Sequence, residues 1–227
     1  MIGTIVNVAT ILVGSALGSI FKKGVGERYQ DILMQAMGLA VTALGISSIV
    51  KYLPDSHYPV LFIVSLAVGG LIGERLNLES SFKSAVSRIS KGNLAEGLTT
   101  AIMLFCIGTL SIVGPIESAL NGNHTYLLSN AMLDGITSMV LASTFGFGIA
   151  WSAAVLFCWQ GLIYVLAGAV AGYITPELLT EISIVGGVLI LSSGLSILGI
   201  KHFKTMNMIP ALFIPVIFIV IKNMLGL

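Results

Sequence analysis

The polar residue best placed for chemistry is Asp134, a carboxylic acid inside an otherwise apolar stretch of the chain. On a helix, Asn130, Asp134, Thr137 and Ser138 fall on one face, because residues three or four positions apart share a side. An ionisable side chain inside a bilayer is costly, which makes it a candidate functional residue by default. Beside amide and hydroxyl oxygens, this acid could accept a proton, coordinate a cation or pair with a substrate ammonium. A structural alternative stays open, in which a protonated Asp134 only locks helix packing.

Two further amides, Asn7 and Gln160, lie deep in apolar runs. We expect each to line a pathway beside the acid, or to act as hydrogen-bonding glue between helices. Gly108, Gly114 and Pro115 predict a different feature, a break in a helix. Because proline lacks an N–H, it frees a carbonyl and can expose helix ends whose dipoles point at an ion.

The elements that position these residues must be membrane helices. Of the 227 residues, 56% are hydrophobic and 9% charged, and the mean hydropathy is +1.01. A soluble domain is roughly a quarter charged, so the composition excludes one. At about 20 residues per crossing, eight helices would use about 160 residues. We therefore predict an all-α integral membrane protein, with spans at 2–21, 31–51, 58–75, 98–117, 126–147, 151–173, 180–200 and 206–226. The fourth and fifth are the candidates for broken or re-entrant helices.

Lys and Arg residues gather on one side of this topology. If all eight segments cross, the first, third and seventh loops carry nine of the 11 basic residues, and cytoplasmic loops carry such an excess. Both termini are therefore expected outside the cytoplasm. Lys22 and Lys23 follow the first apolar run rather than precede it, so we expect that run to stay as a membrane helix and not to be removed as a signal peptide.

The third loop, residues 76–97, has the pattern of an amphipathic helix. Four apolar residues at helical spacing alternate with three basic ones: Leu78, Phe82, Val86 and Ile89, with Lys83, Arg88 and Lys91. We expect this cytoplasmic segment to lie on anionic headgroups. A surface that docks a regulatory partner is the alternative.

Three sequence matches recur in order in the two ends of the chain. They pair Gly14 and Gly18 with Gly168 and Gly172, Gly38 and Gly45 with Gly187 and Gly194, and residues 59–63 with 210–214. The matches join the first span with the sixth, the second with the seventh and the third with the eighth. Because five is an odd number of crossings, the two units would insert upside down relative to each other. This predicts an inverted repeat, typical of secondary transporters, within a single membrane domain, 1–227. Its units are 1–75 and 151–227, on either side of a central helix pair at 98–147. The small-xxx-small pairs Gly14 with Gly18 and Gly168 with Gly172 predict close helix contacts.

Several classes of function are excluded. No group of His, Cys and acidic residues has metal-ligand spacing, and the chain has neither a phosphate-binding loop nor a Ser/His/Asp set. We therefore expect no enzyme activity, no cofactor and no metal centre. The net charge of +1 gives no basic stripe for nucleic acid. The expected partners are the lipid bilayer and a small solute or cation, and a homo-oligomer is left open.

Five motifs resemble those of one family. They are Phe105-Cys106 with Gly108, Leu133-Asp134 with Thr137, Gly186-Gly187 through Gly194-Leu195, Gly199-Ile200-Lys201, and Asn207 through Leu212. On these motifs and across essentially the whole chain, the sequence resembles the YdfK/YqgA family of bacterial membrane proteins, domain of unknown function 554. The resemblance implies a multi-pass protein of the bacterial cytoplasmic (inner) membrane with no established activity. One departure is Asn130-Ala131, where the family pattern has a Lys-Ser pair, so that position offers Asp134 no cationic partner.

We therefore expect gradient-driven movement of a small solute or cation. Asp134 is the expected proton or cation acceptor, and the other pathway residues are Asn130, Thr137, Ser138, Asn7 and Gln160. Channel-like permeation and a non-transport role in membrane assembly or sensing remain the alternatives.

Overall fold

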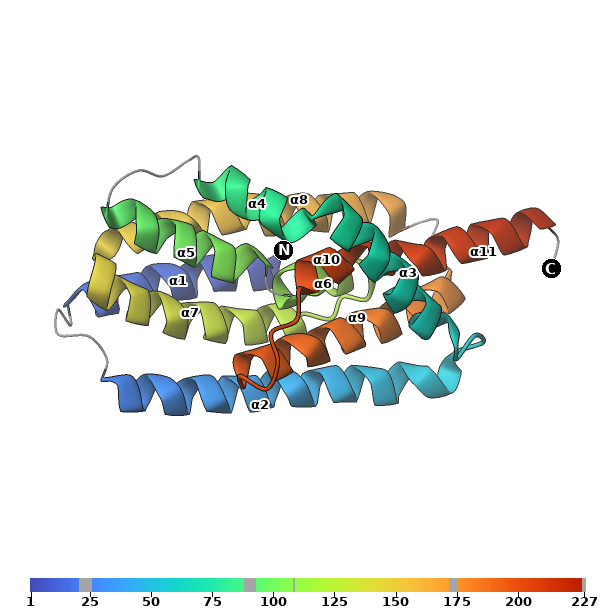
Figure 1. The fold of residues 1–227 in the computed structure, drawn as a ribbon, viewed down its shortest axis with the longest axis horizontal. Coiled ribbons are helices and arrows are strands. Elements are labelled where there is room, and N and C mark those ends of the chain that lie inside the picture. The colour runs from blue at the N-terminus through green and yellow to red at the C-terminus, as the bar shows by residue number, and fades with distance from the viewer. Residues whose placement is uncertain (21–25, 88–92, 108, 172–174, 226–227) are drawn as a thin grey trace. The chain divides into compact units, whose positions relative to one another are not determined.

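The computed structural model describes residues 1–227 without 21–25, 88–92, 108, 172–174 and 226–227, and all regular secondary structure in this part of the chain is helical (Figure 1). The α-helices are α1 (Ile2–Ile20), α2 (Glu27–Tyr52), α3 (Leu61–Leu76), α4 (Leu78–Ser87), α5 (Asn93–Ile107), α6 (Thr109–Leu120), α7 (Thr125–Phe145), α8 (Ser152–Val170), α9 (Pro176–Ile197), α10 (Thr205–Met208) and α11 (Ile214–Leu225). Short 3₁₀ helices are η1 (Leu53–Asp55), η2 (Phe147–Trp151) and η4 (Ile209–Phe213). The predicted all-α class is confirmed.

Five helical segments are long and apolar enough to cross a membrane: Ile2–Ile20, Met34–Asp55, Phe147–Val170, Pro176–Ile197 and Thr205–Met224. Two bent pairs, α3 with α4 and α5 with α6, raise that number to seven if each pair counts as one span. Helix α7 has 21 residues but is not among them, because Asn130, Asp134 and several hydroxyls make it less apolar. Eight crossings therefore stay a prediction.

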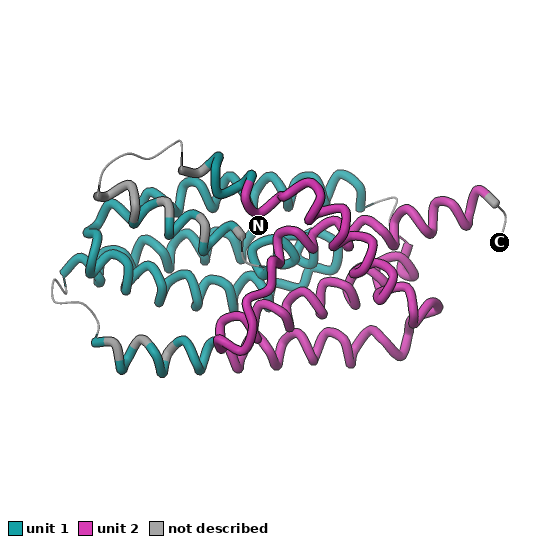
Figure 2. The backbone as a smooth tube through the Cα atoms, in the orientation of Figure 1, with its two compact units in different colours: residues 1–37, 81–171 teal, residues 38–80, 172–227 magenta. Residues whose placement is uncertain are grey.

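The described chain forms two compact units, each assembled from two separate stretches (Figure 2). Unit 1 contains residues 1–37 and 81–171, and unit 2 contains residues 38–80 and 172–227. Helices α1 and α8 therefore share unit 1. Helices α3, α9, α10 and α11, together with α2 from Gly38 onward, belong to unit 2. Both members of each matched pair of spans thus lie in the same unit.

In unit 1, α1 and α7 lie side by side and run in the same direction (Figure 1). A Cβ on Gly14 would collide with the carbonyl oxygen of Gly135, and one on Gly18 with that of Met139. The partners in each pair are 121 residues apart, as are Thr10 and Ala131, which are hydrogen-bonded. This constant separation means that the helices are parallel. The glycines are needed because the two backbones approach without room for side chains.

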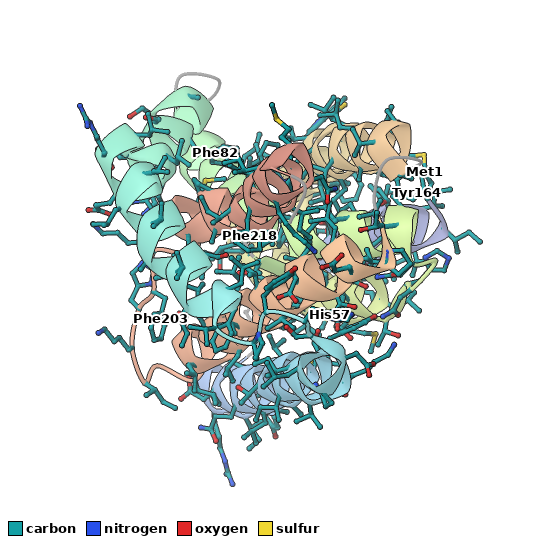
Figure 3. All side chains as sticks on the ribbon, turned by 90° about the vertical axis from the view of Figure 1, so that its right-hand side faces the viewer. Met1, His57, Phe82, Tyr164, Phe203 and Phe218 are labelled. Carbon is teal, nitrogen blue, oxygen red and sulfur yellow. The ribbon has the colours of Figure 1, made fainter. Side chains whose placement is uncertain are left out.

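Helix α8 runs antiparallel to α1 in the same unit. A Cβ on Gly161 would lie 3.4 Å from Cε of Met1, labelled in Figure 3, whereas Ile11 shares a buried cluster with Ala153 and Leu156. Residue numbers therefore rise along α1 as they fall along α8. Nothing lies within 4 Å of a Cβ on Gly168, so the close contact predicted there is wrong within the described chain. Gly172 lies outside the described residues.

The break in the fourth predicted span lies earlier than Gly114 and Pro115. Helix α5 ends at Ile107 and α6 begins at Thr109, and the two segments are bent by 43°. Gly108, one of the three predicted break residues, lies outside the described residues. Helix α6 continues through Gly114 and Pro115, so the predicted break at these two residues is wrong. Residues 109–115 are all buried, and this packing maintains the helix despite the hydrogen bond that a proline removes.

In unit 2, α2 and α9 pack against each other in antiparallel orientation, and small residues line the contact. The close contacts pair Gly38 with Leu198, Gly45 with Leu191, Gly194 with Thr42, and Gly187 with Ser48 and Ile49. Residue numbers rise along one helix as they fall along the other, so the pair is antiparallel. Ser48 also donates a hydrogen bond to the carbonyl of Ser183, at 3.2 Å. These four glycines, which belong to one matched pair of spans, thus lie in one interface.

Helix α3 is antiparallel to the segment formed by α10, η4 and α11. A Cβ on Gly73 would collide with Asn207 and one on Gly69 with Ala211. At the other end, the rings of Tyr58 and Phe218 meet edge to face, with centroids 4.9 Å apart. Asn207 connects three elements, because its Nδ2 donates to Glu74 at 2.7 Å and its Oδ1 accepts from the N–H of Glu79 at 2.8 Å.

The predicted amphipathic helix in the third loop is present as α4, Leu78–Ser87. Its apolar face is partly covered by protein, because the ring of Phe82 packs edge to face on Trp159 of α8 with centroids 5.3 Å apart. Arg88, Ile89 and Lys91 lie outside the described residues.

Candidate functional site

Asp134 is the centre of a buried polar group between α1 and α7. Its Oδ2 accepts two hydrogen bonds, from Nδ2 of Asn130 at 2.7 Å and from Nδ2 of Asn7 at 2.8 Å. Asn130 is one turn earlier on α7, so that bond follows from helical periodicity. Asn7 comes from α1 and is 127 residues away in the sequence. The structure therefore brings three of the predicted site residues into direct contact.

The side chains of this polar group are almost completely buried. The exposed fraction is 0% for Asn7 and 4% for both Asn130 and Asp134. Because burial penalises the charged form of an acid, a carboxylate here depends on its amide donors or on an added positive charge. Both hydrogen bonds that Asp134 accepts within the described chain come from amides rather than from Lys, Arg or His. The site therefore has one acid and neutral amide groups.

The hydroxyl groups near this acid serve mainly to join the two helices. Ser138, fully buried, donates to the carbonyls of Gly135 at 2.8 Å and Ile11 at 3.2 Å. Thr10 Oγ1 bonds the carbonyls of Asn7 and Ala131, each at 2.8 Å. Thr137, also predicted as a pathway residue, is half-buried on α7. Ser138 is thus placed against α1 and bonds the backbone.

Gln160 belongs to a second polar contact, between α8 and α6. Its Nε2 donates to Oγ of Ser111 at 3.2 Å, and both side chains are fully buried. Pro115 lies four residues after Ser111 and has no N–H to offer the Ser111 carbonyl. The proline therefore leaves an acceptor at the residue that Gln160 binds, although it does not end the helix.

Four helices of unit 1 bring these polar residues to a similar level. A Cβ on Gly3 would approach Leu127 to 2.5 Å, one on Gly114 would approach Leu127 to 3.1 Å, and Gly161 lies against Met1. Each polar side chain of the site lies one to four residues from one of these contacts. At 1.5 Å per residue, that is about 6 Å or less along a helix axis. The polar residues are Asn7, Ser111, Asn130 and Gln160.

Several buried atoms of unit 1 have no hydrogen-bond partner within the described chain. They are Oγ1 of Thr4, Oδ1 of Asn7, Oγ of Ser15, Oε1 of Gln160 and Nε1 of Trp159. Four of the five are oxygens, which can accept a hydrogen bond or coordinate a cation. A buried polar atom without a partner is destabilising by about 1–3 kcal/mol. Such a concentration in one unit is consistent with a site whose ligand would complete the bonding.

Neither Thr4 nor Ser111 was among the site residues predicted from the sequence. Thr4 precedes Asn7 by three residues and so shares its helix face, a signal that the sequence does carry. Ser111 was hidden because its importance depends on the packing of α6 against α8, which no periodicity within one helix predicts. Among the described residues, no three His, Cys, Asp or Glu side chains are grouped to hold a metal ion, so a single carboxylate with neutral oxygens is the donor set at this site.

The helices and the buried acid define an all-helical membrane protein with a polar site inside a bundle of apolar helices. The family model described as "Protein of unknown function (DUF554)" matches residues 2–220, and the chain belongs to this family. It is 62% identical over 227 residues to the uncharacterized membrane protein YdfK of Bacillus subtilis (strain 168), which covers 100% of this chain and 99% of that protein. It is 28% identical over 225 residues to the uncharacterized protein YqgA of Escherichia coli (strain K12), with 94% of each chain covered. No solved structure matches the chain. The predicted family resemblance is confirmed.

Proposed function

We propose that this protein is a gradient-driven secondary transporter of a small solute or cation, and that Asp134 is its proton or cation acceptor. Asn7 and Asn130 hold the acid, and Thr4, Thr137, Ser138 and Gln160 contribute to the pathway around it. The observation that carries the proposal is the buried acid itself, bonded by amides from two helices. An intramembrane acid of this kind is expensive and usually marks an ion or substrate path.

The α2–α9 interface supports an inverted repeat. Gly38 and Gly187 are 149 residues apart, and so are Gly45 and Gly194. Gly45 meets Leu191, and Gly194 meets Thr42, which is the residue equivalent to Leu191 under the same separation. Each half of the contact therefore repeats the other with the helices exchanged. This is the contact pattern of a two-fold axis, which an inverted repeat would generate.

The other matched pairs of spans are also antiparallel. Helices α1 and α8 run in opposite directions in unit 1, and α3 opposes α10–α11 in unit 2. Opposite insertion is the relation that inverted repeats require. We propose that the two repeats of three spans, 1–75 and 151–227, move between two symmetry-related states. The site would then be accessible from alternate sides of the membrane.

The helix directions also support eight crossings. Two membrane helices that point the same way must be separated by an odd number of crossings, and α1 is parallel to α7. Counting α2, α3 and the bent α5–α6 pair gives three. The antiparallel pairs α2–α9 and α3–α11 are each separated by four crossings when α7 is also counted. With the basic loops inside, both termini would then lie outside the cytoplasm, in a bacterial inner membrane.

Reconstitution into liposomes tests the proposed function. Uptake of labelled cations and small organic solutes would be measured under imposed pH and Na⁺ gradients, with wild type beside Asp134→Asn. We expect saturable uptake by wild type and loss of coupling in the variant. Equal transport by the two proteins would contradict the role of Asp134. Flux that does not saturate would indicate a channel.

A second variant separates transport from a role in assembly or sensing. Replacement of the basic residues of the third loop, Lys83, Arg88 and Lys91, by Gln removes charges from the cytoplasmic segment without touching Asp134. The transporter proposal expects uptake to persist in this variant. Loss of cellular function in this variant but not in Asp134→Asn would instead support a docking surface.

A further inference from the structure

We infer that the polar group between α1 and α7 is a binding site for a small, dehydrated monovalent metal cation of the Na⁺ class, with ligands from Asp134, Asn7 and Thr4. This inference rests on the proposed function and narrows it, because it names a metal ion rather than a proton as the species that Asp134 accepts.

Two unpartnered oxygens carry the inference. Oγ1 of Thr4 and Oδ1 of Asn7 have no hydrogen-bond partner within the described chain, and both residues are 0% exposed. They are three positions apart on α1, so their side chains leave the helix from the same face. Because both residues are fully buried, neither oxygen can form a hydrogen bond with bulk water. Each has lone pairs with which it can coordinate a cation.

The acid is held beside one of these two oxygens, Oδ1 of Asn7. Nδ2 of Asn7 donates to Oδ2 of Asp134 at 2.8 Å, and the free Oδ1 belongs to the same amide group. The bond therefore keeps an unused carbonyl oxygen close to the carboxylate. A carboxylate, an amide carbonyl and a hydroxyl are the oxygen ligands that hard cations prefer.

The charge and the number of ligands select the class of ion. The site has one carboxylate, and no three His, Cys, Asp or Glu side chains are grouped among the described residues. A single negative charge matches a monovalent ion, whereas protein Ca²⁺ sites take 6–8 oxygens and commonly several carboxylates. A proton on Asp134 would neutralise the acid but leave the oxygens of Thr4 and Asn7 without partners. A metal ion coordinated by all three groups would neutralise the acid and give both oxygens a partner.

Thr10 provides a matched control on the same helix. Its hydroxyl hydrogen is shared between the carbonyls of Asn7 and Ala131, each at 2.8 Å, so this hydroxyl already has partners in the protein without a ligand. Thr4→Val and Thr10→Val make the same chemical change. Only the first removes a proposed ligand, whereas the second removes two protein contacts.

Equilibrium binding of radioactive sodium to the full-length protein in lipid nanodiscs tests the inference. We expect saturable binding of one ion per chain by wild type. Thr4→Val should raise the dissociation constant about ten-fold or more, Thr10→Val should leave it within about two-fold, and Asp134→Asn should abolish binding. Thr4→Ser keeps the oxygen and should bind as wild type, which controls for any fault in folding.

The outcomes distinguish this inference from the proposed function. Absence of saturable sodium binding by wild type overturns the inference, as does an equal loss of affinity in Thr4→Val and Thr10→Val. Sodium displaced more readily by ammonium than by Li⁺ or K⁺ also overturns it, in favour of an amine. In each of these cases proton-coupled uptake that depends on Asp134 would leave the transport proposal intact. Tight sodium binding without gradient-driven uptake in liposomes would support the sodium site and contradict the transport proposal.

Discussion

At the scale of single residues, the shared acceptor Oδ2 of Asp134 connects α7 to α1 through the hydrogen bond from Asn7. Two amides donate to this one oxygen. An amide at position 134 has a carbonyl oxygen that can accept the same two bonds, although it has no charge. A hydrocarbon side chain there would leave both amides without an acceptor. Structure and charge can therefore be separated by the choice of substitution.

This separation gives a prediction for stability. Asp134→Leu should lower the free energy of unfolding by about 1–3 kcal/mol for each amide left without a partner, whereas Asp134→Asn should remain close to wild type. Thermal unfolding of the purified proteins in detergent measures both. An Asp134→Leu variant as stable as Asp134→Asn would mean that the two hydrogen bonds do not form.

At the scale of helices, equivalent positions of the proposed repeat have different surroundings. Gly14 of α1 is pressed against the backbone of α7, while a Cβ on Gly168 of α8, 154 residues later, would have nothing within 4 Å. The sequence motif is the same in both helices. What differs is that α1 has a parallel neighbour along this face within the described chain.

The same substitution should therefore have opposite effects at the two glycines. Gly14→Ala forces a Cβ into the Gly135 carbonyl and should destabilise the protein by about 1–3 kcal/mol. Gly168→Ala should be neutral or stabilising by up to about 1 kcal/mol, because alanine is the better helix former. Comparison of the two unfolding temperatures checks this. A strong loss of stability at Gly168 would reveal a contact with another chain.

At the helix scale, the register of residues within one helix could be predicted from the sequence, whereas the pairing of helices and the position of the break could not. The face shared by Asn130 and Asp134 was predicted correctly, because register within one helix follows from a period of 3.6 residues. The bond from Asn7 to Asp134 could not be derived, since the pairing of α1 with α7 depends on packing over 127 residues of sequence. The helix break was misplaced at Gly114 and Pro115, because the buried surroundings of α6 outweigh one lost hydrogen bond.

At the scale of the whole molecule, composition alone identified an all-helical membrane protein, and the motifs identified its family. The number of crossings is harder to predict from the sequence. The polar residues of the candidate site lower the hydropathy of α7, so this helix does not stand out as a membrane span. Only the directions of packed helices, parallel for α1 and α7 and antiparallel for the matched pairs, supply the parity argument for eight crossings. Those directions are properties of the fold.

The topology can be tested by labelling single cysteines in intact cells. In a background without Cys106 and Cys158, His57→Cys should react with a membrane-impermeant maleimide, because the loop after α2 is expected outside. Lys201→Cys should react only after the membrane is permeabilised, since the loop after α9 is expected in the cytoplasm. Both native side chains are exposed, so burial does not limit either reaction. The same labelling at both positions would contradict the eight-span topology.

The central claim, that Asp134 marks a ligand site rather than a packing contact, is tested most directly by thermal unfolding of purified wild type beside Asp134→Asn. Both proteins would be scanned in detergent against cations, amino acids, nucleobases and small organic acids at several pH values. A ligand that binds only the folded state raises its apparent stability by mass action. We predict that at least one compound raises the unfolding temperature of wild type, saturably, and has no effect on Asp134→Asn. No shift for wild type with any compound, together with a variant that is merely less stable, would contradict the claim and leave Asp134 as a packing residue.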